Sequence, residues 1–293
     1  MTREELQQCQ ARATAAAGRL RLPLRSRVWR GQSGEFTGGG TGSSMDFQDH
    51  RAYSPGDDPR HINWNAYART ENYTMKLYRE EVRPLVDVIL DASESMFFDP
   101  QKATRTAELF YFLTESSLAA GVSLTLHALR GDAVLTLDPA TVRGHHWLEA
   151  IRNLPSAAPA GTPDLSRIAL RANSIRVFLS DLLFNGEPEA ILRQLGQRHG
   201  TRILFSPYLK SEASPDWAGN YEFIDPETQA RHQHRVEAPV LRRYLEAYSG
   251  HFALWKNTAI RHQTAFARIP AEEELSAVLF HEALAAGALE STR

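Results

Sequence analysis

Three oxygen-bearing side chains follow an apolar run about a third of the way along the chain. The run LVDVIL, residues 85–90, leads directly into DASESM, which places Asp91, Ser93 and Ser95 at alternate positions. A near-continuous apolar run of this length is typical of a strand buried on both faces of a sheet. Carboxylate and hydroxyl oxygens are the ligands that a hard divalent cation prefers. The stretch therefore predicts a site for such an ion at the end of a buried strand.

Two further oxygen-bearing residues lie at comparable points. Thr162 ends the small-residue segment PSAAPAGT, and Asp181 ends the run IRVFLSD. Ligands of an open parallel sheet collect outside the carboxyl ends of its strands, where the strand order reverses. If the strands starting near residues 85 and 175 are neighbours there, five side chains face one cavity: Asp91, Ser93, Ser95, Thr162 and Asp181. Each alone also fits a structural role, such as a helix N-cap for Thr162, and only their joint placement favours a metal site.

The charges of this set indicate which ligands it would take. Two carboxylates balance a divalent ion, and neutral hydroxyls leave that ion electrophilic toward one further anionic ligand. We expect Mg²⁺, with Mn²⁺ or Ca²⁺ as alternatives, and a partner's acidic side chain as the external ligand. We also expect Ser93 and Asp181 to sit on a solvent-facing rim, so that replacing either by alanine leaves the fold intact.

Strands and helices alternate from residue 85 onward, as in an α/β protein. Strands are expected over 85–90, 122–129, 133–138, 175–183, 201–209 and 262–269. Helices are expected over 100–120, 145–154, 163–173, 187–197, 238–257 and 271–287. A hairpin over 221–237, with the turn Asp-Pro-Glu-Thr, is expected before the helix at 238.

The first 84 residues have a different texture. A helix is expected over 2–17, a strand over 19–31 and another over 73–82, with a glycine-rich loop between them. This part is too short and too rich in glycine to build a core of its own. We therefore expect two parts: residues 1–84, packed on the main domain, and the α/β domain of residues 85–293.

Composition excludes several classes of protein. The net charge is -2, which gives no overall attraction to nucleic acid, and the single cysteine, Cys9, excludes a disulfide framework. The N-terminus has no secretory signal and no apolar stretch is long enough to span a bilayer, so we expect no integral membrane segment and a cytoplasmic location. Zinc is a weak alternative, because two histidine pairs, His232 with His234 and His145 with His146, have no acidic or cysteine partner at ligand spacing.

The motifs resemble those of a known domain. DASES, the pair Gly161-Thr162 and Asp181 in FLSD resemble the three-part metal-ion-dependent adhesion site of von Willebrand factor A domains. This resemblance implies a Rossmann-like von Willebrand factor A fold over residues 85–293. It also implies that Ser93, Ser95 and Thr162 bind the metal directly, and that Asp91 and Asp181 act directly or through water.

Two stretches resemble the signature of the bacterial "domain of unknown function fifty-eight" family. They are RAYSPGDDPRHINWNAYART, residues 51–70, and YTMKLYREE, which follows it. Members of that family couple this N-terminal segment to a von Willebrand factor A-like domain, and they are typically encoded beside MoxR-type AAA+ ATPases. The resemblance implies a metal-dependent protein-binding module, an adaptor or chaperone-like partner of such an ATPase, with no enzymatic activity.

Two other interpretations remain open. One is a Mg²⁺-dependent hydrolase on a Rossmann-like scaffold. That chemistry commonly needs a second carboxylate two residues after a nucleophilic aspartate, where this chain has Ser93. The other is a metal-free scaffold, which follows if the five oxygens do not converge.

Overall fold

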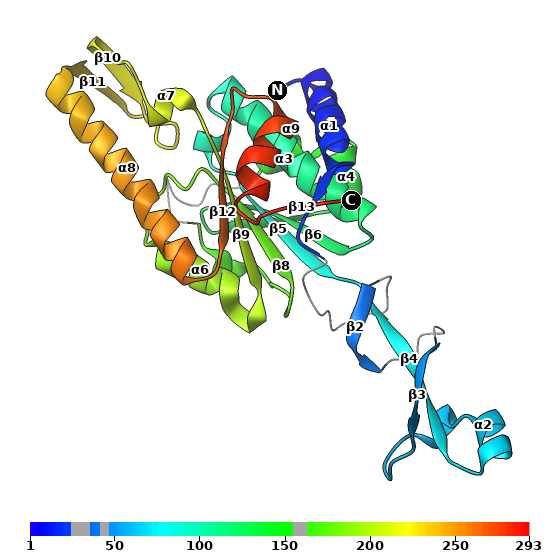
Figure 1. Cartoon of the computed structure of the whole chain (residues 1–293). Coiled ribbons are helices and arrows are strands. Elements are labelled where there is room, and N and C mark those ends of the chain that lie inside the picture. Colours follow the sequence, from blue (N-terminus) through cyan, green and yellow to red (C-terminus); the bar gives the residue numbers. More distant parts are fainter. Residues whose placement is uncertain (25–35, 42–46, 155–162, 293) are drawn as a thin grey trace. The chain divides into compact units, whose positions relative to one another are not determined.

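The computed structural model describes residues 1–24, 36–41, 47–154 and 163–292. These residues form two compact units, one of residues 1–24 with 85–293 and one of residues 25–84 (Figure 1). The expected division places residues 1–84 together, but α1 (Arg3–Ala17) belongs to the first unit because it packs along α3 (Pro100–Ala119). The packing of residues 25–84 on that unit stays a prediction.

A six-stranded, mostly parallel sheet forms the centre of the first unit. Its strands, in spatial order, are β12 (Ala265–Pro270), β9 (Thr201–Tyr208), β8 (Ile175–Leu179), β5 (Leu85–Asp91), β6 (Ser123–Arg130) and β7 (Ala133–Leu137). Only the edge strand β7 runs antiparallel to its neighbour. The expected α/β class is thereby confirmed.

Strand order reverses at β5. From β5 the chain passes outward through β6 and β7, then returns to form β8 on the other side of β5. The predicted pairing is confirmed, because β5 and β8 are parallel hydrogen-bonded neighbours with Val86 opposite Ile175. Their carboxyl ends therefore meet at one edge of the sheet, which is where ligands of such sheets bind.

Helices cover both faces of this sheet. On one face α6 (Pro188–Gly196) and α8 (Ala238–Arg261) pack over Ile89, Phe178 and Leu204 of three adjacent strands. Successive side chains of a strand point to opposite faces of the sheet. The residues that alternate with Ile89, Phe178 and Leu204 therefore point to the second face, where α3 contacts β5, β6, β8 and β9. The apolar pattern of each strand is continuous because both faces are covered.

The helix α1 covers the outer side of α3. Cys9 of α1 is fully buried there, and Arg12 and Gln10 pair with the carboxylates of Glu108 and Glu115 on α3. Glu108 and Glu115 are buried because α1 lies over them and bonds to them. The capping box formed by Thr2 and Glu5 starts this covering helix.

Two predicted elements are shorter in the structure. Only a 3₁₀ turn, Leu165–Arg167, forms where a helix was expected over 163–173. There the chain is held by Arg171, which bonds the buried carboxylate of Asp87 through both its backbone N–H and its guanidinium group. The strand expected over 19–31 is reduced, among the described residues, to β1 (Leu20–Arg21), which pairs with β13 (Glu290–Ser291).

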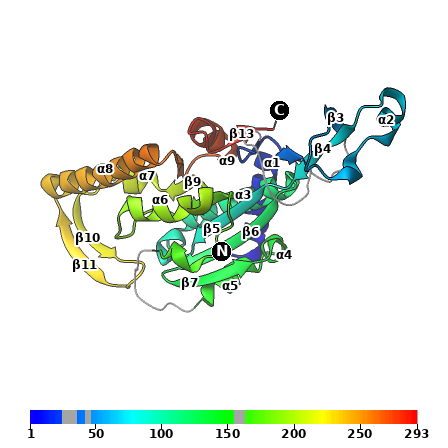
Figure 2. The same cartoon turned by 90° about the horizontal axis from the view of Figure 1, so that it is seen from below.

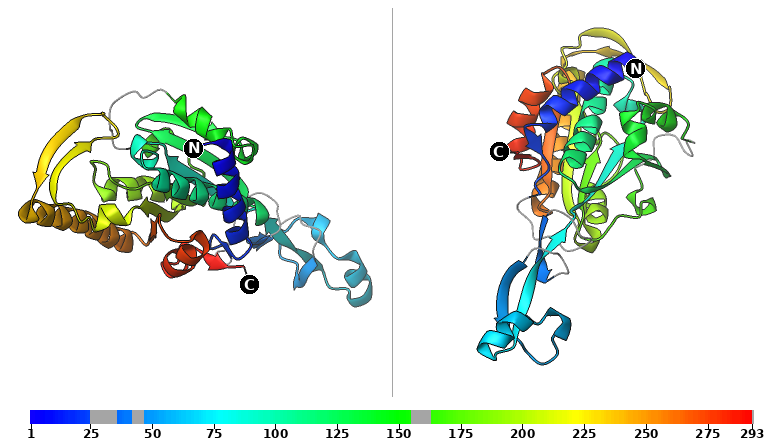
Figure 3. Two further views of the ribbon diagram at one scale, coloured as in Figure 1. Left: turned by 90° about the horizontal axis from the view of Figure 1, so that it is seen from above. Right: turned by 90° about the vertical axis from the view of Figure 1, so that its right-hand side faces the viewer.

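Between β9 and α8 the chain forms a short helix and a hairpin. They are α7 (Lys210–Ala213), β10 (Gly219–Ile224) and β11 (Arg231–Val236). Figures 2 and 3 show the hairpin curving away from the N-terminal end of α8, with its turn directed toward the body of the unit. The unit also contains α4 (Pro139–Arg143), α5 (Trp147–Arg152), α9 (Leu275–Val278) and a π-helical continuation (Leu279–Leu284).

The second unit is a small antiparallel sheet with a short helix. Its strands are β2 (Phe36–Thr41), β4 (Thr74–Val82) and β3 (Phe47–Ala52), in that spatial order, with a 3₁₀ turn (Pro59–His61) and α2 (Trp64–Thr70) between β3 and β4. Among its residues whose burial is described, the buried side chains of the apolar core are Ile62 and Met75.

Candidate metal centre

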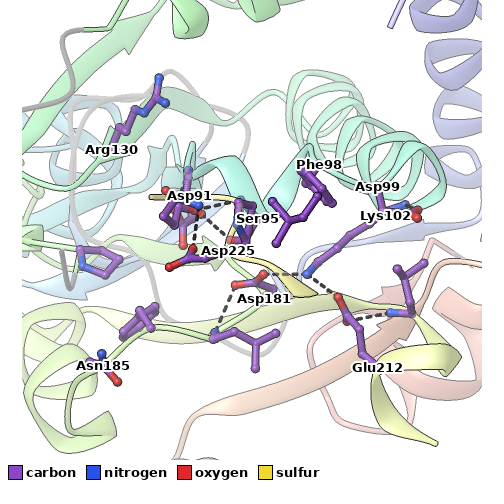
Figure 4. Close-up of a pocket in the computed structure, with 18 of the residues that line it drawn as sticks. Asp91, Ser95, Phe98, Asp99, Lys102, Arg130, Asp181, Asn185, Glu212 and Asp225 are labelled. Carbon is purple, nitrogen blue, oxygen red and sulfur yellow. Dashed lines mark hydrogen bonds and ion pairs between the residues drawn. The ribbon is translucent and has the colours of Figure 1, made fainter. Parts of the chain in front are cut away.

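A cavity of about 660 Å³ lies at the carboxyl ends of β5 and β8. It brings together four of the five predicted side chains, Asp91, Ser93, Ser95 and Asp181. Figure 4 labels three of them, Asp91, Ser95 and Asp181. The fifth, Thr162, lies outside the described residues, although the adjoining Pro163 lines the cavity.

Asp91 is the last residue of β5 and is only 2% exposed. Its carboxylate accepts hydrogen bonds from the backbone N–H of Ser93 at 3.0 Å and from the hydroxyl of Ser180 at 2.6 Å. No cationic side chain within the described ranges pairs with it. Burial, and then repulsion from Asp181, raise the pKa of Asp91 to about 6. The fold thus holds a carboxylate away from water without a counter-ion.

Ser93 and Ser95 follow Asp91 on a tight 3₁₀ turn, Glu94–Met96. The turn brings the two hydroxyl oxygens within 3.1 Å of each other on the wall of the cavity. The backbone N–H of Ser95 donates a 2.9 Å hydrogen bond to the carboxylate of Glu227, from the turn between β10 and β11. Two hydroxyls and two carboxylates therefore lie around this end of β5.

Asp181 follows β8 and is held from two sides. Its Oδ2 accepts a 2.7 Å bond from Nζ of Lys102, and its Oδ1 accepts one from the backbone N–H of Leu183 at 3.1 Å. The intervening Leu182 has a positive φ of 61°, so the chain turns sharply as it leaves the strand. Asp181 is therefore fixed in place before any ligand binds.

Lys102, near the start of α3, is the cation of this edge. Its ammonium group is 2% exposed and bonds both Asp181 and Glu212 of α7, the latter at 3.0 Å. Burial lowers the pKa of Lys102, but the charges of Asp181 and Glu212 raise it by more, so that it lies above its ordinary value. Lys102 neutralises Asp181 and leaves Asp91 without a partner.

The expectation that Asp181 lies on a solvent-facing rim was wrong. Asp91 and Asp181 are both 2% exposed, while Ser93 and Ser95 are only partly covered. Asp181→Ala would leave the buried charge of Lys102 with Glu212 alone, which destabilises a fold. The serines are therefore the positions at which the site can be altered without disturbing buried charge.

Three residues of this edge, Lys102, Glu212 and Glu227, carry no signal that the sequence patterns reveal. Lys102 lies three residues after Asp99, the N-cap of α3, and a lysine at such a position is ordinarily solvated. Glu227 lies in the predicted hairpin turn, which was given no role. The topology gives one indication of its role. Because β9 is parallel to β5 and β8, a hairpin that follows β9 begins at the edge of the sheet where Asp91 and Asp181 lie.

The donor set fits a hard cation. The described residues that line the cavity include six acidic and two basic side chains, and one of the two basic ones, Arg130, already pairs with Glu94. Within the described ranges no group of three or more His, Cys, Asp or Glu is arranged to hold a metal ion. A metal ion at this edge would thus depend on the hydroxyls of Ser93 and Ser95 as well as on Asp91, a set suited to Mg²⁺.

The other weighed residues lie elsewhere. His232 and His234 stack on the hairpin, and His145 bonds the hydroxyl of Tyr111. Burial raises the pKa of the Cys9 thiol to about 11. No helix in the part of the chain that the structure describes is both long and apolar enough to cross a membrane.

Two solved structures are similar to part of this chain. One is an aerotolerance-related membrane protein from Bacteroides fragilis NCTC 9343 with multiple mutations to serines, at 12% identity and a TM-score of 0.30. The alignment covers 60% of this chain and 99% of that one. The other, the conserved hypothetical protein BatB from Bacteroides thetaiotaomicron, has 9% identity and a TM-score of 0.33, covering 61% of this chain and 98% of its own.

No curated protein matches the sequence. A family model, described as "Protein of unknown function DUF58", matches residues 49–251, which include most of the second unit, β5 to β9, the hairpin and half of α8. The predicted family is therefore confirmed, and the chain belongs to the DUF58 proteins of unknown function.

Proposed function

We propose that the chain is a metal-dependent protein-binding module with a von Willebrand factor A-type fold. In this proposal Mg²⁺ binds at Asp91, Ser93 and Ser95, and the bound ion captures an exposed Asp or Glu of a partner protein. The partner class is a MoxR-type AAA+ ATPase or a protein that such an ATPase remodels, in the cytoplasm.

One observation carries the proposal, the state of Asp91. A buried carboxylate without a cation is costly, and its raised pKa of about 6 reflects that cost. Asp91 nevertheless lies beside two hydroxyls on an open cavity, where a cation would relieve the repulsion from Asp181. Because Lys102 is already shared between Asp181 and Glu212, the relieving cation has to come from solution.

Each residue has a distinct task in this site. Mg²⁺, when bound, supplies two positive charges and an open position for an anionic ligand. Asp91 provides the nearest negative charge, and Ser93 and Ser95 provide neutral oxygens. Asp181, clamped by Lys102, keeps a second negative charge in a fixed place beside them.

The mouth of the cavity supports a protein as the partner. Phe98 and Leu183 line the cavity and are 56% and 43% exposed. Exposed apolar side chains beside a polar capture point are typical of protein interfaces, where aromatic anchors contribute most of the binding energy. The assignment to a MoxR-type ATPase is supported by the family resemblance.

The test is binding of a purified MoxR-type AAA+ ATPase from the same genome to the immobilised full chain. We expect binding with Mg²⁺, loss of binding in EDTA, and loss of binding in the Ser93→Ala/Ser95→Ala variant. The control variant Ser211→Ala changes an exposed serine of α7 and should bind like wild type. Equal binding in EDTA and by the Ser93→Ala/Ser95→Ala variant would contradict the proposal.

A further inference from the structure

The turn between β10 and β11 places a carboxylate of the chain itself at the candidate metal centre. Glu227 lies in this turn and accepts a 2.9 Å hydrogen bond from the backbone N–H of Ser95 through its Oε1. Its Oε2 has no hydrogen-bond partner among the described residues, and no described cation pairs with Glu227. The side chain lines the same cavity as Asp91 and Asp181.

The turn that carries Glu227 is ordered by its own side chains. Asp225 accepts hydrogen bonds from the backbone N–H groups of Glu227 and Thr228, and its Oδ2 accepts a 2.7 Å bond from the Thr228 hydroxyl. The Thr228 hydroxyl and then the Glu227 N–H hold the pKa of Asp225 below its ordinary value. The carboxylate of Asp225 is therefore occupied by hydrogen bonds within the turn, and Glu227 is the carboxylate that the turn presents to Ser95 and the cavity.

The hairpin is also fixed at its base. Trp217, just before β10, packs on Phe223 of the hairpin and on Tyr244 of α8, with ring centroids 5.1 and 5.0 Å apart. The hydroxyl of Tyr244 donates a 2.8 Å bond to the backbone carbonyl of Glu212, the residue that shares Lys102 with Asp181. These contacts tie the position of the hairpin to the edge of the sheet.

We infer that Glu227 is an internal ligand of this centre, which takes the position that a partner's acidic side chain would otherwise occupy. The inference rests on the proposed metal site. Its basis is that a third carboxylate meets Ser95 from a preformed turn, with one oxygen free to face a cation. Because Lys102 already neutralises Asp181, the two charges of a bound divalent ion would be balanced by Asp91 and Glu227.

This arrangement makes the hairpin a control element for partner binding. An acidic residue of a partner can bind the metal only after Glu227 withdraws, so the partner's apparent affinity is its intrinsic affinity multiplied by the fraction of molecules in which the hairpin is open. The base of the hairpin is held by Trp217, but the side chains along both strands are largely exposed, so the turn can move away from Ser95 while the base stays in place.

The test uses Mn²⁺ as the probe on the full chain, with calorimetry for affinity and water-proton relaxation for the number of exchanging water molecules. Glu227→Gln should weaken Mn²⁺ binding about tenfold or more, a typical loss for a residue that supports a metal. Glu227→Ala should raise the number of exchanging waters, and added acetate should restore affinity in this variant but not change wild type. Glu222→Gln, on the same hairpin and paired with Arg231, is the matched control and should behave like wild type.

The outcomes separate this inference from the proposed function. If wild type binds Mn²⁺, the Ser93→Ala/Ser95→Ala variant does not, and Glu227→Gln binds as tightly as wild type, the internal ligand is overturned and the metal site stands. If wild type itself fails to bind Mn²⁺, both are overturned. Unchanged thermal unfolding of Glu227→Gln and Glu222→Gln establishes that the effects arise at the site.

Discussion

Two buried aspartates at one edge of the sheet have opposite electrostatic environments. Asp181 has the ammonium group of Lys102 at 2.7 Å, whereas Asp91 has only hydrogen-bond donors around it and is repelled by Asp181. The difference cannot be read from their sequence contexts, since both end apolar strands. It makes Asp91 the residue whose charge the metal-free protein tolerates least.

The first prediction is that Asp91→Asn stabilises the metal-free protein at neutral pH. The folded state holds the Asp91 proton up to about pH 6, while the ordinary value is 3.8, so stability falls as pH rises between these values. A shift of this size corresponds to roughly 3 kcal/mol in the free energy of unfolding. In EDTA near pH 7.5 the variant should therefore unfold at higher denaturant concentration than wild type, and near pH 4 the two should coincide.

The result that would count against this is a variant that is less stable than wild type in EDTA at neutral pH. Such an outcome would mean that Asp91 is already neutralised by the protein. The reason for placing a cation beside it would then be lost.

The second prediction concerns Lys102. Lys102→Met leaves Asp181 and Glu212 without their buried cation, so unfolding in EDTA should cost about 3 kcal/mol less than in wild type. Mg²⁺ should restore more stability to this variant than to wild type, because the site is more negative. Denaturant titrations with and without Mg²⁺ measure both effects. Lys210→Met, which removes an exposed pair with Glu273, should change little, and a similar loss in both variants would argue against a special role for Lys102.

At the scale of elements, the sequence predicts the sheet well and the segment before β8 poorly. The strands β5 and β8 are readable because each is a continuous apolar run. Their pairing was a condition of the predicted site, and the structure shows that the condition is met. The helix expected over 163–173 fails because Arg171 bonds Asp87, 84 positions away, and this tertiary contact overrides local propensity.

The same reason explains what sequence analysis could find of the site. Asp91, Ser93, Ser95 and Asp181 share a cavity because they follow two adjacent strands. Their position directly after an apolar run is a local feature that the sequence shows. Lys102 and Glu227 reach the site through helix and hairpin geometry, and their roles depend on contacts with residues 79 and 132 positions away. No local pattern marks such contacts.

The third prediction tests the packing of α1 on α3. Cys9 is fully buried between them and its pKa is about 11, so near pH 8 the reactive thiolate is roughly 100-fold rarer than for an exposed thiol. A thiol reagent should react with the native protein at least about 100-fold more slowly than with the protein in denaturant. Fast reaction under native conditions would show that α1 separates from α3 in solution.

At the scale of the whole molecule, residues 25–84 are inserted between two parts of one folding unit. The chain forms α1 and β1, leaves for the second unit, and returns to begin β5 at Leu85. A fragment that starts at Leu85 would therefore lose α1 and leave Glu108 and Glu115 of α3 without their partners on α1. Truncation at that point does not test the independence of the second unit.

The fourth prediction concerns the independence of the second unit, which is tested by excising residues 25–84. A chain in which residues 25–84 are replaced by a flexible Gly-Ser linker of about fifteen residues should keep its fold and its metal affinity, because every described lining residue of the cavity lies outside the excised part. The isolated segment 25–84 should not unfold cooperatively, since its described apolar core is small. Circular dichroism and calorimetry measure both. Loss of metal binding on excision would show that the second unit contributes to the site.

The central claim is that Asp91, Ser93 and Ser95 bind a divalent cation, and direct calorimetric titration of the full chain with Mg²⁺ tests it. The account predicts that wild type binds one ion and that the Ser93→Ala/Ser95→Ala variant, with an unchanged melting temperature in EDTA, does not. Ser211→Ala should bind like wild type. Absence of binding by the wild-type chain, or equal binding by wild type and the Ser93→Ala/Ser95→Ala variant, would contradict the account.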